Sequence, residues 1–297
     1  VPSITVGAGT SYIGTQGAFP TRTHKGVIDE LKIYNYARSS SQVIEDMNGG
    51  HPAPGSPVGS SVAKWKLDEG YGTTAHDNSI NANDLTLSTA SWTNDAKFGK
   101  AFNGLTNVRM SRADDADLDF AASDDFSFSF WFKSDSATNP SANEYLLEKG
   151  GNITTDAIGY AIYTSAASDG LICFGIDDDS TSFPEDETCS SSDLYDSTWH
   201  HVVAKKTGTT RLDLYVDGKP TGTPDTSISA TGTLENSATF YIGDTNGTDG
   251  TDEFLGDIDE IQVFRSALAD DQIKALFNNA SDVSMGALST DSSNNPS

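Results

Sequence analysis

The stretch Phe126-Ser-Phe-Ser-Phe-Trp-Phe132 decides the fold of this chain. Phenylalanine occupies every second position and serine separates the first three, which is the period of a β-strand that buries one face. Trp131 makes the end of the stretch apolar on both faces. The pattern therefore predicts a strand in the middle of a sheet.

Other short segments of the same kind follow this stretch. Tyr160–Tyr163 and Leu171–Phe174 are predicted strands, and Trp199–Ala204 with Arg211–Val216 is a predicted hairpin pair. Asp217-Gly218 then supplies a tight turn. Many short strands between turn residues are typical of a sandwich or a barrel, so we expect an all-β fold.

The composition agrees with this fold class and limits the partners. The 297 residues are 36% hydrophobic and rich in glycine, which favours short strands and turns over a helical bundle. The net charge of −25 repels phosphate backbones, so we expect no nucleic-acid partner. The acidity has two interpretations that can hold together, a solvated surface and carboxylates clustered to bind calcium. No run approaches the ~20 apolar residues of a membrane span, so we expect no membrane insertion.

An internal repeat sets the predicted organisation. Tyr12-Ile-Gly14 is followed about a dozen residues later by Gly26–Ala37, and Tyr241-Ile-Gly243 is followed in the same way by the similar Gly256–Ala267. A short helical pattern comes after each copy. We interpret residues 1–47 as the C-terminal strands of a preceding domain in a longer tandem array; the alternative is that these strands dock elsewhere.

A linker-like segment lies on each side of the main domain. Residues 48–61 are rich in Gly, Pro and Ser, and residues 280–297 form a Ser- and Asn-rich tail or linker. We expect one complete domain over residues 62–279.

The two cysteines, Cys173 and Cys189, flank an acidic loop. Oxidised, they would close a loop and contribute about 3 kcal/mol. Without a nearby CxxC motif or histidine they make a poor zinc site. The sequence predicts a disulfide, with two free thiols as the alternative.

Seven segments in register resemble one family. They are Ala63–Gly70, Ala75–Ser79, Phe98–Gly104, Asp125–Phe132, Trp199–Val203, Leu214–Gly218 and Gly256–Ile261. In this order they resemble the laminin G-like jelly-roll domains of the concanavalin A-like lectin/glucanase superfamily. The resemblance implies an antiparallel β-sandwich, commonly with one structural calcium ion, in extracellular proteins that are secreted or displayed on the cell surface.

The resemblance also implies where calcium would bind. In related sandwiches the first and last strands run side by side, so acids from both can meet. The predicted calcium ligands are Glu69, Asp77 and Asp259, with Asn83 or a backbone carbonyl as a further ligand. The alternative is that these acids cap turns and accept hydrogen bonds from backbone amides.

No catalytic residue is predicted. The pair His200-His201 falls within a predicted core strand, where we interpret it as structural. Glycoside hydrolysis needs two carboxylates about 5–10 Å apart across the sugar. No strand-like segment carries the Glu-x-Asp-x-Glu spacing that sandwich glycosidases use.

A glycan site needs an exposed aromatic side chain beside polar groups. The candidates in or near loops are Tyr71, Trp92, Tyr145, Phe183 and Tyr195, and the alternative is that they tuck under their own loops. The acidic loop Asp177–Glu187 is a further candidate, for a second cation or a basic partner, against the simpler interpretation that it is solvated.

These observations predict a non-catalytic binding or adhesion module of a tandem-repeat protein, with a glycan or a surface protein as its partner. One alternative is a structural repeat of a surface layer, stalk or filament that self-assembles through tandem domains. The other is an accessory domain of a secreted glycoside hydrolase.

Overall fold

A computed structural model describes residues 15–16, 19–23, 61–79, 81–150, 158–165, 170–178, 183–245 and 252–279. The chain divides into two compact units, Val1–Asp46 and Met47–Ser297. In the first unit, β1 (Thr15–Gln16) and β2 (Phe19–Thr23) pair antiparallel. The predicted strand and helix that end this unit, nearly all of the linker 48–61 and the tail 280–297 lie outside the described residues. The tandem organisation therefore stays a prediction.

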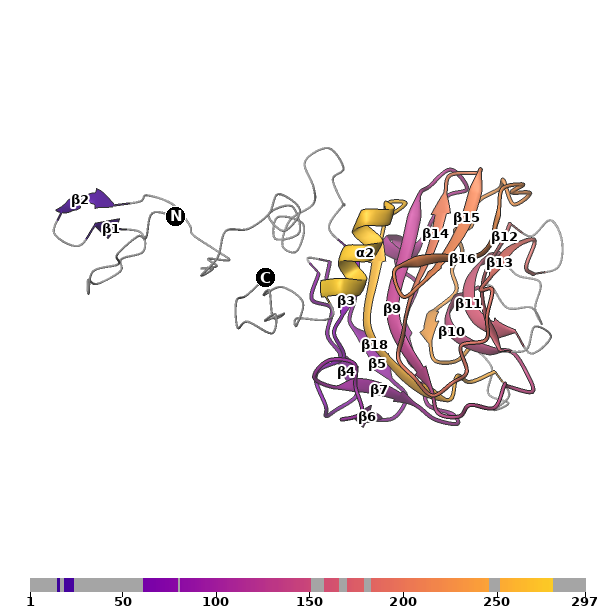
Figure 1. Cartoon of the computed structure of the whole chain (residues 1–297), viewed down its shortest axis with the longest axis horizontal. Coiled ribbons are helices and arrows are strands. Elements are labelled where there is room, and N and C mark those ends of the chain that lie inside the picture. Colours follow the sequence, from indigo (N-terminus) through magenta and orange to yellow (C-terminus); the bar gives the residue numbers. More distant parts are fainter. Residues whose placement is uncertain are drawn as a thin grey trace, which may run out of the picture. The chain divides into compact units, whose positions relative to one another are not determined.

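The described part of the second unit contains two eight-stranded antiparallel sheets that face each other (Figure 1). The first sheet has the order β16-β15-β14-β9-β18-β7-β6, and β3 also pairs with β18. Its strands are β3 (Ala63–Trp65), β6 (Trp92–Thr93), β7 (Ala101–Gly104), β9 (Phe126–Ser134), β14 (His200–Thr207), β15 (Arg211–Val216), β16 (Lys219–Asp225) and β18 (Gly256–Phe264).

The second sheet has the order β13-β12-β11-β10-β17-β8-β5-β4. Its strands are β4 (Thr74–Ala75), β5 (Leu85–Leu87), β8 (Met110–Arg112), β10 (Glu144–Lys149), β11 (Gly159–Ser165), β12 (Leu171–Asp177), β13 (Asp186–Cys189) and β17 (Phe240–Ile242). A 3₁₀ turn, η1 (Ala116–Leu118), and a helix, α2 (Asp270–Asn279), complete the described elements. The predicted antiparallel β-sandwich is confirmed.

Strand β9 lies at the centre of the first sheet, between β14 and β18. The four phenylalanines Phe126, Phe128, Phe130 and Phe132 are fully buried in the core between the sheets. Residues between them point to the other face of the first sheet, as alternation requires. The alternating aromatic pattern thus correctly predicted a central strand, and the β14–β15 hairpin is also confirmed.

Helix α2 covers part of the outer face of the first sheet (Figure 1). Ile273 packs with Val203 and Phe264, and the ring of Phe277 stacks on Trp131 with centroids 5.6 Å apart. His201 is buried beneath this helix and hydrogen-bonds through Nε2 with Ser129 Oγ at 2.9 Å. This environment agrees with the structural interpretation of His201.

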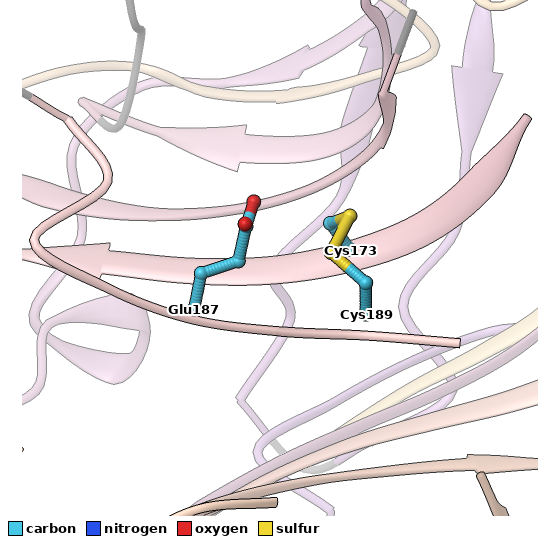
Figure 2. A group of neighbouring side chains, drawn as sticks. All are labelled: Cys173, Glu187 and Cys189. Atoms are coloured by element: carbon cyan, nitrogen blue, oxygen red, sulfur yellow. A yellow bond between two sulfur atoms is a disulfide. The ribbon is translucent and has the colours of Figure 1, made fainter. Parts of the chain in front are cut away.

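A smaller apolar cluster surrounds the two cysteines of the second sheet. Cys173 of β12 and Cys189 of β13 lie directly opposite each other and form a disulfide (Figure 2). Tyr145, Tyr163 and Phe183 pack in the same cluster, separate from the core between the sheets. The disulfide therefore joins two neighbouring strands and belongs to a packed cluster.

Candidate functional site

The structure separates the five aromatic candidates by exposure. Tyr145, Phe183 and Tyr195 are 1%, 5% and 4% exposed, so they follow the alternative in which loop aromatics tuck under their loops. Trp92 is partly buried at the edge of the core. Tyr71 is 81% exposed and differs from the other four.

The loop that carries Tyr71 is held by two contacts. Gly70 and Gly72 both have positive φ angles, +64° and +71°, which L-residues with side chains rarely adopt. The indole Nε1 of Trp92 donates to the carbonyl oxygen of Gly72 at 2.9 Å. The methylene stem of Lys100 lies over Gly70, where an added Cβ would come 2.2 Å from Cδ of the lysine. These contacts fix the backbone on both sides of an exposed ring.

Polar groups lie beside the same loop. The Lys100 ammonium donates to Oδ1 of Asn94, and the Lys100 backbone N–H donates to Oδ1 of Asp68 at 2.9 Å. An aromatic face packs against apolar C–H groups, and neighbouring amide, ammonium and carboxylate groups exchange hydrogen bonds with hydroxyls. We call Tyr71, Trp92, Asn94 and Lys100 the Tyr71 site. Sequence reasoning missed Lys100 and Asn94, although Gly-Tyr-Gly at 70–72 indicated a tight loop with an aromatic tip.

Asp77 of the predicted calcium set acts as a loop cap. Its Oδ1 accepts from the backbone N–H groups of Lys64 and Ser79 at 2.8 and 2.7 Å. Its Oδ2 accepts from the Ser79 hydroxyl at 2.6 Å and from the Asn83 N–H at 2.8 Å. Four donors occupy this carboxylate, as in the alternative interpretation, and a cation would have to displace some of them.

The other two predicted ligands, Glu69 and Asp259, have different surroundings. Glu69 Oε1 accepts from the His76 N–H at 2.8 Å, and its Oε2 is buried without a hydrogen-bond partner among the described residues. Asp259 is fully buried and accepts from the N–H groups of Phe98 and Glu260, both at 2.8 Å. One oxygen of Glu69 therefore has no described hydrogen-bond partner, whereas both oxygens of Asp259 accept backbone hydrogen bonds.

Two groups of described residues place three potential ligand atoms within 4.8 Å of one another. One is Cys173, Glu187 and Cys189, in which the sulfurs are already bonded to each other (Figure 2). The other is Asp177, Asp178 and Glu185 at the base of the acidic loop. Glu69, Asp77 and Asp259 do not form such a group, so the structure does not bring the predicted ligands together.

The buried Asp259 predicts a pH-dependent stability. Burial is the largest cause that raises the pKa of this carboxyl to about 8. Repulsion from Glu260 and Asp68 also raises this pKa, and the two backbone hydrogen bonds lower it. An unfolded aspartate titrates near ~3.9, so the folded state binds more protons between about pH 4 and 8 and stability falls as pH rises through that range.

With a chelator present, we expect the contribution of Asp259 to the free energy of unfolding to be about 2 kcal/mol lower at pH 8 than at pH 5. Burial lowers the pKa of His201 to about 4, which acts in the opposite direction, so the contribution is measured as the difference between the parent chain and Asp259→Asn. Urea titrations at the two pH values measure the difference. Asp259→Asn should lose the fall in stability toward pH 8, and equal pH dependence of the parent and the variant would show that other groups cause it.

Comparisons with known proteins agree with the fold. The family model of the concanavalin A-like lectin/glucanases superfamily, of the laminin G type, matches residues 108–274, more than half of the chain. No curated protein sequence matches significantly. In the described residues, no helix combines the length and the apolar character needed to cross a membrane.

Several solved structures share the fold. The binding domain of Paraclostridial Mosquitocidal Protein 1 is similar with a TM-score of 0.59 at 17% identity, over 75% of this chain and 53% of that one. The binding domain of Botulinum neurotoxin DC, in complex with rat synaptotagmin II, gives 0.58 at 16% identity, over 74% and 52%. A structure from work on cell entry of botulinum neurotoxin type C, described as dependent on two ganglioside molecules, gives 0.58 at 16% identity, over 81% and 53%. The chain spans about half the length of these neighbours, and at such identities the likeness establishes the fold alone.

Proposed function

This chain belongs to the concanavalin A-like lectin/glucanases superfamily, and we propose that it is an extracellular, non-catalytic module that binds a glycan through the Tyr71 site. The observation that carries the proposal is an aromatic ring left 81% exposed by a loop whose backbone is held in place. A ligand that covers this ring removes apolar surface from water, which is favourable by about 25 cal/mol per Å². Because the loop is already ordered, little conformational entropy is lost when it binds.

The chemistry of the site favours an uncharged sugar. The ring of Tyr71 offers a flat apolar face, which suits the C–H face of a pyranose. Lys100 and Asn94 offer hydrogen bonds to hydroxyls, but the chain as a whole carries a net charge of −25. That charge repels sulfated and other polyanionic glycans. The proposed ligand is therefore a neutral pyranose unit displayed on a cell surface or matrix.

A glycan array probed with the full chain tests this function. We expect retention on neutral glycans, with no release of reducing ends when the same glycans are incubated with the protein. Release of reducing ends would instead make the chain a hydrolase. No retention of any sugar, together with self-assembly in solution, would replace the proposal with a structural repeat.

Substitution of Tyr71 should weaken binding selectively. A stacked aromatic contributes ~1.5–2 kcal/mol or more to such contacts, so Tyr71→Ala should raise the Kd for the retained glycan at least about tenfold. Isothermal titration calorimetry measures the change. Leu105→Ala is the matched control, because Leu105 is also an exposed large hydrophobic residue, at 50%, and should leave the Kd unchanged. Equal effects of the two substitutions would place binding elsewhere.

A structural calcium ion is the second part of the proposal and comes from the family. Glu69 supports it, because its Oε2 is buried and has no hydrogen-bond partner among the described residues. Carboxylate oxygens are the ligands that calcium prefers. Asp77 would need to give up hydrogen bonds to take part.

Calcium removal should therefore lower the thermal stability. We expect the unfolding midpoint to be several degrees higher in millimolar calcium than in chelator, because an ion that binds only the folded state stabilises it. Glu69→Gln should remove most of this difference in differential scanning calorimetry. Equal midpoints of the parent chain with calcium and with chelator would refute a structural ion.

A further inference from the structure

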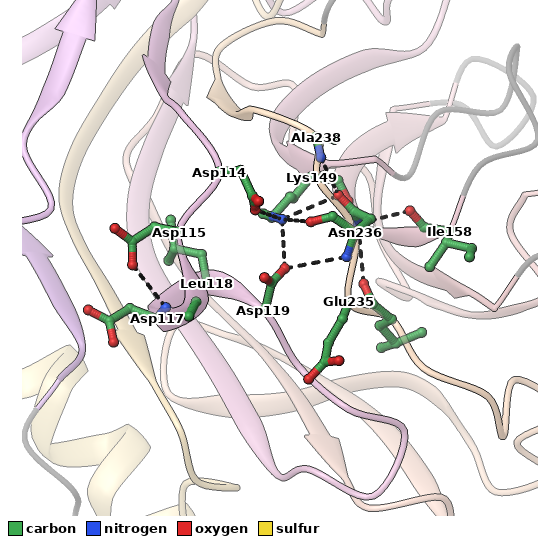
Figure 3. A network of polar contacts seen from close by, with 12 residues as sticks. Asp114, Asp115, Asp117, Leu118, Asp119, Lys149, Ile158, Glu235, Asn236 and Ala238 are labelled. Atoms are coloured by element: carbon green, nitrogen blue, oxygen red, sulfur yellow. Dashed lines mark hydrogen bonds and ion pairs between the residues drawn. The ribbon is translucent and has the colours of Figure 1, made fainter.

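Lys149 at the end of β10 is a buried lysine whose amine contacts two carboxylates and a side-chain amide. Its side chain is 1% exposed, and its Nζ lies 2.9 Å from Asp114 Oδ1 and 2.7 Å from Asp119 Oδ1. The same nitrogen lies 2.6 Å from the backbone oxygen of Asn236 and 3.2 Å from its side-chain Oδ1 (Figure 3). An amine is thus held against a carboxamide in a site that largely excludes water.

The side-chain amide of Asn236 is oriented on every side (Figure 3). Its Oδ1 accepts from the Ala238 N–H at 2.8 Å. Its Nδ2 donates to the carbonyl oxygens of Lys149, Ile158 and Leu234 at 3.3, 3.0 and 3.2 Å. Hydrogen bonds to both Oδ1 and Nδ2 therefore hold Cγ of Asn236 in place.

Gly150 makes room for this approach. Its φ is +74°, and an added Cβ would lie 2.8 Å from Nδ2 and 3.1 Å from Cγ of Asn236. Only a residue without a side chain allows the amide to pack against the backbone that follows Lys149.

We propose that Lys149 and Asn236 form an intramolecular isopeptide bond, a covalent cross-link between β10 and the segment before β17. The inference does not depend on the proposed glycan function. The reacting groups are prepositioned in the fold, and prepositioning is what turns a slow reaction between an amine and an amide into an effectively unimolecular one.

The reaction needs only groups that the site holds. Asp119 takes a proton from the Lys149 ammonium, and the freed Nζ lone pair attacks Cγ of Asn236. Negative charge then develops on Oδ1, where the Ala238 N–H donates a hydrogen bond. Asp119 passes this proton, and then the second proton that Nζ loses in the tetrahedral intermediate, to Nδ2; the Cγ–Nδ2 bond breaks, and the nitrogen leaves as ammonium. The Nζ–Cγ amide forms, and the two protons that Nζ loses leave with the departing nitrogen, so atoms and charge balance without an oxidant or cofactor.

Asp119 is the better placed of the two carboxylates for this proton transfer. Its Oδ1 lies 2.7 Å from Nζ and accepts from the Asn236 backbone N–H at 3.4 Å, so this carboxylate contacts the reacting amine and the backbone of the residue that carries the amide. When Lys149 loses its ammonium charge, the carboxylates of Asp114 and Asp119 lose their positive partner. Asp114 is 42% exposed and can be solvated, and the guanidinium of Arg265 donates to the backbone oxygen of Asp119.

Intact-mass spectrometry of the full chain tests the proposal. After reduction of the Cys173–Cys189 disulfide, we expect the chain to be lighter than its sequence by the mass of one ammonia. A protease digest should contain one branched peptide that joins Lys149 to Asn236. A reduced chain at its full sequence mass would overturn the proposal.

Two further results distinguish the cross-link from another reaction that also loses one ammonia. A succinimide at Asn236-Ser237 also loses ammonia, but it leaves Lys149 unmodified and gives no branched peptide, and that outcome would overturn the proposal too. The matched control is Lys149→Arg, which keeps the positive charge without a nucleophilic amine and should have its full sequence mass. If that variant fails to fold, the peptide map of the parent chain still decides.

Discussion

Replacing Phe128 with alanine is expected to lower the free energy of unfolding by about 3–5 kcal/mol. Phe128 is fully buried in the central strand β9, with ring centroids 5.1 Å from Tyr160 and 5.7 Å from Phe126. Its removal leaves a cavity between the two sheets that the surrounding rings cannot fill without leaving their rotamers. Denaturation in urea, followed by tryptophan fluorescence, measures the change.

The control for this prediction is Leu105→Ala, at an exposed position, which should change stability by less than ~0.5 kcal/mol. If Phe128→Ala were as mild as this control, β9 would not be the centre of the core. That result would contradict the sandwich, because the buried phenylalanines of β9 form the centre of its core.

Removal of the disulfide has the second largest expected effect. Cys173→Ser with Cys189→Ser should destabilise the chain by about 3 kcal/mol, because the bond closes a segment with a sequence separation of 16 and restricts the unfolded state. The serine hydroxyls would also enter the cluster of Tyr145, Tyr163 and Phe183. Both effects lower the unfolding midpoint.

Chemical denaturation with and without reductant checks this result. Reductant should shift the midpoint of the parent chain toward that of the double variant and leave the variant itself unchanged. A parent chain that responds no more to reductant than the double variant would show that the bond is absent from the protein in solution.

Local patterns predicted the strands, whereas long-range pairing could not be predicted from them. The period of two in Phe126–Phe132 and the hairpin of Arg211–Val216 depend on neighbouring residues, and both are confirmed. Strand β17 pairs with β10 on one side and β8 on the other, more than ninety residues away in sequence. Such pairings depend on the whole topology, which no local period encodes.

The site residues show the same limit. Five aromatic side chains had equal standing as candidates in the sequence, and only the folded loops show that Tyr71 is exposed while Tyr195 is covered. Asp77 looked like a ligand, but its four donors come from residues whose approach requires the folded loop. Lys149 and Asn236 are 87 residues apart, and no motif links them.

The central claim is that this sandwich binds a glycan at the Tyr71 site. An NMR titration of the ¹⁵N-labelled full chain tests this claim most directly. With a glycan retained on the array, we predict saturable shifts at the amides of Gly70 to Gly72 and at the indole Nε1 of Trp92, which hydrogen-bonds to Gly72. Saturable shifts confined to other parts of the chain, with these signals unmoved, would contradict the claim.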